Sequence, residues 1–171
     1  MEAIEMIKTR RSVRSFKPNP VDMETLDRVL ETATYAPSGK GKQLAQIVCV
    51  TDRGATDKLR RMNADVLGID SDPYYGAPVI VVVLAPKSSA TPTEDGSAVL
   101  MTMALAVHAE GLAACWINRE QQMFDSPEGK ALLREWGLSE DLRGVGALAI
   151  GYADGSMPEP MKRRDDYIIN V

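Results

Sequence analysis

The sequence predicts one domain in which a β-sheet is covered by helices, in either an α+β or an α/β arrangement. Four apolar runs with the composition of strands alternate with helical patterns along the chain; they are residues 47–50, 79–85, 112–117 and 144–152. The 171 residues contain no repeat and no linker-like stretch, so residues 1–171 are expected to form a single domain. Periodicity alone does not choose between the two arrangements.

The first two helices are indicated by spacing and by capping residues. Residues 2–9 carry apolar side chains at helical intervals. Pro18 and Pro20 cannot continue that helix, because proline lacks a backbone donor. A second helix should begin after Asp22, whose carboxylate can cap it, and should stop before Pro37.

Three further helices are expected in the remainder of the chain. Residues 54–67 look helical but lack a clear stop signal. Residues 91–94, Thr-Pro-Thr-Glu, have the form of a capping box and predict a long helix that ends at Gly111. Residues 99–109 of that helix are apolar nearly all round, so we expect burial on every side, in the core and in a subunit interface. Residues 126–136 begin with Ser-Pro-Glu and predict the last helix.

The composition excludes several classes of partner. Apolar residues make up 44% of the chain, charged residues make up 26%, and the formal net charge is -4. Nucleic-acid and membrane-surface binders usually carry a net basic field, so neither partner is expected, and a phosphate ligand should be small and locally held. The longest apolar segment is too short for a membrane span, and the N-terminus lacks the apolar region of a signal peptide. We therefore expect a cytoplasmic protein.

The stretch Arg10-Arg11-Ser12-Val13-Arg14 has the composition of an anion site. In an extended chain, alternate side chains share a face, so Arg10, Ser12 and Arg14 would point the same way. In a helix, Arg10 and Arg14 would still meet at i, i+4. Two forked, permanently charged donors and a hydroxyl suit a phosphate better than a single carboxylate. The alternative is a solvated basic helix end.

The usual signatures of side-chain catalysis are missing from the sequence. It has no nucleophile triad, no clustered metal ligands and no H-E-x-x-H motif. The single histidine, His108, is expected to be structural, and Cys49 and Cys115 are expected to be reduced core residues. A phosphate cradle at residues 38–42 is a weak alternative, because the loop lacks the P-loop spacing and precedes a strand.

Several segments, in this order, resemble the nitroreductase family of FMN-dependent oxidoreductases. They are the R-R-S-V-R stretch, the loop A-P-S-G-K-G-K-Q, the long apolar helix, the run G-L-A-A-C-W-I and the C-terminal K-R-R. The resemblance covers residues 7–167. It implies an α+β fold with a central mixed, mostly antiparallel sheet flanked by helices, and a C-terminal segment that extends onto a dimer partner.

The resemblance also implies which residues bind the cofactor. The R-x-S-x-R element and a basic pair near the C-terminus would hold the FMN phosphate and ribityl groups, a loop would reach the isoalloxazine of the partner subunit, and the backbone after residue 112 would face the ring near N5. The implied cofactor-binding residues are Arg10, Arg11, Ser12, Arg14, Pro37, Ser38, Gly39, Gln43, Trp116, Ile117, Asn118, Lys162 and Arg164.

The function implied is hydride transfer from NADH or NADPH through FMN to a nitroaromatic, quinone or similar small-molecule acceptor by a ping-pong mechanism, in a homodimer with flavin at the subunit interface. Because a flavin carries the chemistry, no catalytic side chain and no metal are expected. Related branches include flavin-fragmenting and dehalogenating members.

The sequence departs from the family pattern in two places. Of the family's N-x-Q-P-W segment only Gln43 is kept, and the long helix offers Thr102 or Met103 where many members carry asparagine. The loss of the N-x-Q-P-W segment motivates an alternative, a non-catalytic flavin-binding or flavin-sequestering protein.

Overall fold

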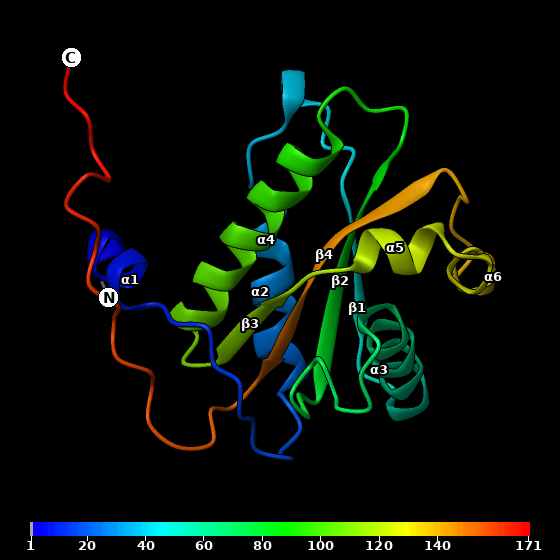
Figure 1. Cartoon of the computed structure of the whole chain (residues 1–171), viewed down its shortest axis with the longest axis horizontal. Coiled ribbons are helices and arrows are strands. Elements are labelled where there is room, and N and C mark those ends of the chain that lie inside the picture. The colour runs from blue at the N-terminus through cyan, green and yellow to red at the C-terminus, as the bar shows by residue number, and fades with distance from the viewer. Residues whose placement is uncertain (1) are drawn as a thin grey trace.

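The structure is a computed structural model, and it describes residues 2–171. Its centre is a four-stranded sheet in the order β1-β2-β4-β3, in which all neighbouring strands are antiparallel (Figure 1). The strands are β1 (Gln46–Val50), β2 (Val79–Pro86), β3 (Ala113–Ile117) and β4 (Leu142–Gly151). The α+β prediction is confirmed, and all four predicted strands are present.

The core has two halves because β2 is apolar on both faces. Side chains alternate across a strand, so Ile80, Val82 and Leu84 enter one cluster, whereas Val79, Val81 and Val83 enter the other. The first cluster is completed by α3 (Arg53–Leu67), α5 (Glu120–Asp125) and α6 (Pro127–Glu135). The second is completed by α2 (Met23–Ala33) and α4 (Pro92–Ala109). Figure 1 shows these helices on opposite faces of the sheet.

The predicted helix ends are largely confirmed. The Asp22 carboxylate accepts from Thr25 N at the start of α2, and Ser126 Oγ accepts from Gly129 N at the start of α6. Gly68, in the left-handed conformation, ends α3 and supplies the stop signal that the sequence analysis did not identify. The short helix α5 was also not predicted.

One expectation about α4 is corrected. The helix begins at Pro92, but Thr91 makes no side-chain cap, so the predicted capping box does not form. Within this chain α4 is buried in part: Met101 is 38% exposed, and Thr102 and Leu105 are half-buried, so burial of these side chains in a subunit interface stays a prediction. The described part of the chain, residues 2–171, has no helix with the length and apolar character needed to cross a bilayer. Cys49 and Cys115 are not joined by a disulfide; Cys115 is buried as expected, whereas Cys49 is half-buried beside the core.

The two ends of the chain lie on the β3 side of the sheet. The first helix, α1 (Ala3–Thr9), leads into residues 12–17, which run beside β3 and the end of β4. Val13 N donates to Ala114 O (3.0 Å), and Lys17 N donates to Tyr152 O (2.9 Å). Residues 154–171 are exposed and extend away from the sheet toward α1 (Figure 1).

The contact between α4 and β4 depends on Gly96. A Cβ atom at this position would lie 2.6 Å from Val145 Cγ2 and 2.8 Å from Val145 Cβ. We predict that Gly96→Ala lowers the free energy of unfolding by about 1–3 kcal/mol in urea denaturation, because overpacking outweighs the gain in helix propensity. Ser97→Ala, at the next position of α4, should change it by less than about 0.5 kcal/mol. A stabilised Gly96→Ala protein would contradict the prediction.

Candidate functional site

The basic stretch adopts the extended geometry. Arg10 follows α1 with backbone angles φ -57° and ψ 133°, and Ser12 forms a parallel bridge with Ala114 of β3. Val13 points into the core, where it is 4% exposed. Because side chains alternate in an extended segment, Arg10, Ser12 and Arg14 therefore share the face that points away from this core. The structure brings these three predicted residues together along β3.

Three N–H donors in this region lack a partner. Arg10 Nε, Arg11 Nε and Trp116 Nε1 are buried and make no hydrogen bond within residues 2–171. The Arg11 guanidinium is also anchored locally, since Nη1 donates to Lys8 O (2.7 Å) and Arg10 O (2.8 Å). Buried donors are normally paired in folded proteins, so these atoms mark a candidate position for a ligand with acceptor oxygens or nitrogens.

The arginines of this stretch are not neutralised by ion pairs with other described residues. Among the described ion pairs, none includes Arg10, Arg11 or Arg14. Burial raises the pKa of Cys115 in β3, and the charges of Arg14 and Arg10 oppose that rise. Such a field favours an anion.

His108 is held by a contact between helices. Burial lowers the pKa of His108, and Arg10 and Arg11 lower it further. Its Nε2 atom lies 2.9 Å from Thr9 Oγ1, which joins the C-terminal end of α4 to α1. This contact supports the structural role predicted for His108.

The predicted flavin loop lies at the other end of α4. Gly39 N donates to Asp95 Oδ1 (2.9 Å), and Gln43 N donates to Ser38 Oγ (2.9 Å). Gly39 approaches α4 closely, because a Cβ atom there would clash with Thr91 Oγ1. Ser38 and Gln43 line a cavity of about 210 Å³, whereas Pro37 is exposed at the start of the loop.

The two groups of predicted residues are separated by the length of α4. The loop is attached at Asp95 and α1 at His108, which at about 1.5 Å rise per residue are roughly 20 Å apart along the helix. A single chain therefore brings Arg10, Ser12 and Arg14 together with β3 but holds Ser38 and Gln43 away from them.

The basic residues of the tail stay within the tail. Lys162 Nζ lies 3.7 Å from Asp165 Oδ2, and Arg164 pairs with Asp166 at 2.6 Å. All four side chains are exposed, and no described contact joins them to residues 10–14.

A buried polar network follows β3 and was missed by the sequence analysis. Trp116 is half-buried and Ile117 is buried, both in β3; Asn118 is exposed just after it. Asn63 of α3 bonds to Asn118 O and to Arg119, and the Tyr74 hydroxyl donates to Glu120 Oε1 (2.9 Å). These residues are distant in sequence. The available signal was one asparagine next to Met62 on the apolar stripe of α3.

The carboxyl group of Glu120 is the most perturbed acid of the network. It is 0% exposed, and its Oε2 atom has no partner in the described structure. Burial raises the pKa of Glu120 to about 7, although the hydrogen bond from Tyr74 lowers it. This carboxyl group therefore changes charge near neutral pH.

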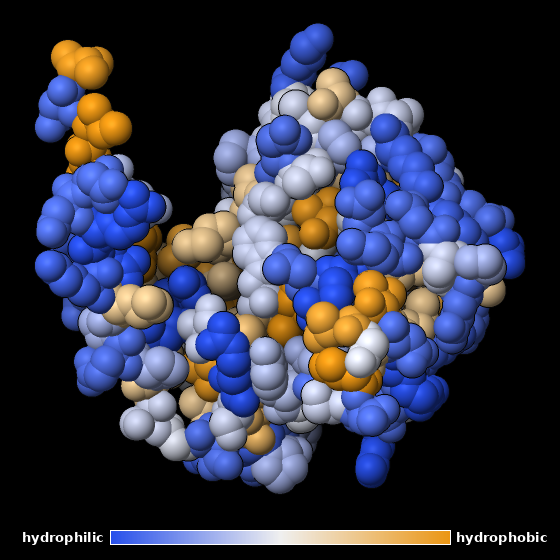
Figure 2. Space-filling view, in the orientation of Figure 1, coloured by the Kyte–Doolittle hydropathy of each residue, from blue (hydrophilic) through white to orange (hydrophobic). Residues whose placement is uncertain are grey.

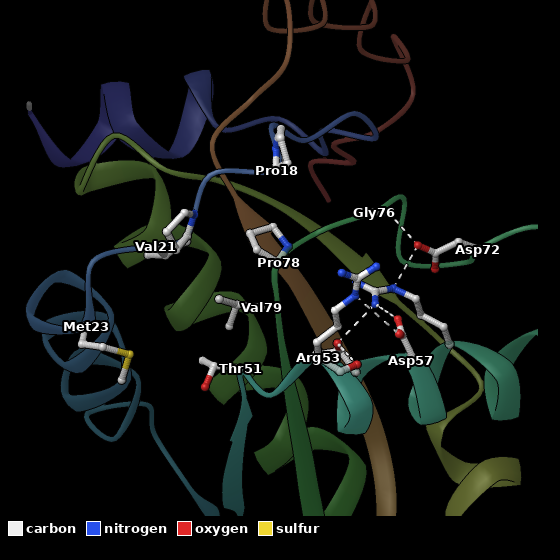
Figure 3. A pocket seen from close by; sticks show the side chains of 13 residues that line it. Pro18, Val21, Met23, Thr51, Arg53, Asp57, Asp72, Gly76, Pro78 and Val79 are labelled. Atoms are coloured by element: carbon white, nitrogen blue, oxygen red, sulfur yellow. Dashed lines mark hydrogen bonds and ion pairs between the residues drawn. The ribbon is translucent and has the colours of Figure 1, made fainter.

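A cavity of about 730 Å³ lies elsewhere and contains none of the predicted site residues (Figure 3). One wall is apolar and includes Pro18, Val21 and Pro78. On the charged wall, Arg60 donates to Asp57 (2.6 Å) and Ala77 O (2.6 Å) and pairs with Asp72 (3.1 Å). Because these charges neutralise one another, the cavity does not resemble a phosphate site.

Comparisons with known proteins point to one family. A sequence model described as the nitroreductase family matches residues 7–69. The crystal structure of a nitroreductase with bound FMN from Bacteroides fragilis superposes with a TM-score of 0.91 at 28% identity, covering 100% of this chain and 99% of that chain. A second nitroreductase with bound FMN, from Desulfitobacterium hafniense, gives 0.87 at 23% identity, with 98% and 97% coverage. The nitroreductase NfnB of Mycolicibacterium smegmatis is 26% identical over 89% of this chain and 83% of its own length.

The titration of Glu120 should be visible in protein stability. Its pKa is raised to about 7 from 4.5, so the folded state retains a proton that the unfolded chain releases. Stability should therefore fall as pH rises from about 4.5 to about 7, by up to about 3 kcal/mol. We predict that Glu120→Gln removes this fall in urea denaturation between pH 4.5 and 7.5. Parallel curves for the two proteins would contradict the prediction, because residues other than Glu120 titrate in both.

Proposed function

We propose that the chain is an FMN-dependent oxidoreductase of the nitroreductase family that acts between NADH or NADPH and a small acceptor. The observation that carries the proposal is the group of guanidiniums without ion pairs and with unpaired buried donors beside β3. The full-length superposition on an FMN-bound nitroreductase at 28% identity supports it.

The residues beside β3 fit the cofactor's donor and acceptor groups. Arg10, Ser12 and Arg14 would hold the phosphate, and Arg11 would add charge from its anchored position. Lys162 and Arg164 would join them if the tail packs against a partner subunit. The segment comprising Trp116, Ile117 and Asn118 would face the ring. We assign the partner contact to Pro37, Ser38, Gly39 and Gln43.

A homodimer explains why the loop residues lie far from the arginine stretch within one chain. The loop at Asp95 and the arginines near His108 are separated by roughly 20 Å, so the loop can complete a site only on another copy of the chain. Exposed apolar residues support such a partner: Ile4 and Ile7 on α1, and Ile168 and Ile169 on the tail. The end of the tail is the apolar, isolated segment in Figure 2.

When bound, FMN supplies hydride transfer from NADH or NADPH to a nitroaromatic, quinone or similar acceptor, the two substrates occupying the site in turn. The chain's own residues bind and orient the cofactor, and their positive field favours negative charge at the site. No side chain is assigned a covalent or acid-base step.

A flavin-sequestering protein is the second candidate. The observation that favours it is the exposed loop after Gly39, in which Gln43 has a left-handed backbone (φ 52°) and bonds to Ser38 Oγ. This loop keeps Gln43 but not the asparagine, proline and tryptophan of the family segment.

Turnover distinguishes the two functions. We predict that the purified protein is yellow, releases FMN on denaturation and oxidises NADH or NADPH in the presence of a quinone. Release of FMN without quinone-dependent oxidation would favour sequestration. A protein that binds no FMN would eliminate both functions.

The phosphate anchor can be separated from the rest of the site with two flavins. Charge-assisted hydrogen bonds contribute roughly 1.5–3 kcal/mol, so Arg14→Ala or Lys162→Ala should weaken FMN binding to the apoprotein by roughly ten- to a hundredfold. Riboflavin lacks the phosphate and should lose far less affinity. Titration by flavin fluorescence measures both dissociation constants.

Arg134→Ala is the matched control for this titration. Arg134 is an exposed guanidinium on α6 that pairs with Glu140, so its loss should leave both affinities unchanged. Equal losses for FMN and riboflavin in Arg14→Ala, or no loss for either, would mean that the basic stretch is only a solvated patch.

A further inference from the structure

Asn63 forms hydrogen bonds to the turn that follows β3 through both the nitrogen and the oxygen of its side-chain amide. The side chain is 0% exposed, on the face of α3 that packs on α5. Its Nδ2 atom donates to Asn118 O (2.9 Å), and its Oδ1 atom accepts from Arg119 Nε (2.8 Å). One side chain therefore fixes two consecutive residues.

The turn contains a backbone conformation that is unfavourable for a residue with a side chain. Arg119 has φ 85° and ψ 0°, in the left-handed region that disfavours residues with a side chain. Such conformations persist only where the surroundings hold them. Arg119, the residue with this unfavourable backbone, donates from its Nε atom to Asn63. This hydrogen bond therefore opposes a change of the turn to a more favourable conformation.

The orientation of the Asn63 amide is itself determined by its neighbours. Nδ2 faces the Tyr74 hydroxyl oxygen (3.2 Å) and Glu120 Oε1 (3.4 Å) in addition to Asn118 O. A flipped amide would place its oxygen against the Asn118 carbonyl and its nitrogen against Arg119, losing both bonds. Asn63 is 0% exposed, so bulk water would not replace the partners that its amide loses.

We propose that Asn63 is a positioning residue for the flavin: by fixing the Asn118–Arg119 turn it sets how the backbone after β3 faces the ring, and Tyr74 and Glu120 hold its amide in register. The inference rests on the proposed function, in which the segment comprising Trp116, Ile117 and Asn118 faces the ring. It is separate from the phosphate anchor, because Asn63 acts on the segment that faces the ring.

The test compares Asn63→Leu with Leu59→Ala in the FMN-loaded full-length protein. Leucine keeps the branching of the asparagine side chain at Cγ but is larger and makes no hydrogen bond. Leu59 is a fully buried core residue on the same helix, so its truncation reports general destabilisation. The readouts are the dissociation constants of FMN and riboflavin, the visible circular dichroism of the bound flavin and its midpoint potential.

Asn63→Leu should weaken FMN and riboflavin alike, by about tenfold, which corresponds to the loss of one hydrogen bond's contribution. It should also move the flavin dichroism and the midpoint potential away from the wild-type values. Leu59→Ala should lower the melting temperature and leave these flavin properties unchanged. If Asn63→Leu does not fold, Tyr74→Phe removes only the hydroxyl that orients the amide and should move the same readouts less far.

Three outcomes would overturn the proposal. The first is wild-type flavin properties in Asn63→Leu, or in Tyr74→Phe if Asn63→Leu does not fold. The second is an equal change in Leu59→Ala, which would make the effect one of general destabilisation. The third is a wild-type protein that binds no FMN, which would remove the proposed function together with this inference; the first two leave the proposed function standing.

Discussion

Burial of β2 on both faces is the constraint on which the other elements depend. With apolar helices covering each side, the backbone groups of β2 can be satisfied only by neighbouring strands, and β1 and β4 supply them. β4 in turn pairs with β3, whose outer edge is covered by residues 12 and 13. The arginine stretch is thus placed by sheet pairing, since the bond from Val13 N to Ala114 O fixes which side chains face away from the core.

Because the arginine stretch is held beside β3, a chain that is acidic overall has one positively charged region. The net charge is -4, yet Arg10, Arg11 and Arg14 lie together without ion pairs among the described residues. Some arginines elsewhere do form pairs, as Arg28 does with Glu110 (2.8 Å). Holding like charges together costs free energy, and the proposed FMN phosphate would offset that cost. Under the proposed function, this local concentration of positive charge serves one ligand.

Local sequence patterns predicted the strands and the helix caps. The features that they did not predict depend on contacts between residues distant in sequence. The strands, the Asp22 and Ser126 caps and the arginine stretch each depend on neighbours within a few residues, so the sequence contains their signal. The choice between extended and helical geometry at residues 10–14 stayed open because both bring Arg10 and Arg14 to one side. The network of Asn63, Tyr74 and Glu120 joins separate elements, and none of these residues has a distinctive local motif.

The proposed homodimer would account for the remaining difference between the sequence pattern and the single chain. The apolar residues of α4 predict burial on all sides, yet Met101 is 38% exposed and Leu105 half-buried in this chain. The same helix separates the flavin loop from the arginine stretch by roughly 20 Å. One cause accounts for both observations if a second copy covers this face of α4 and brings its own loop to the arginines. In that arrangement α4 has two effects. Its length separates the loop from the arginines within one chain, and its exposed face packs against the second chain, whose loop then reaches these arginines.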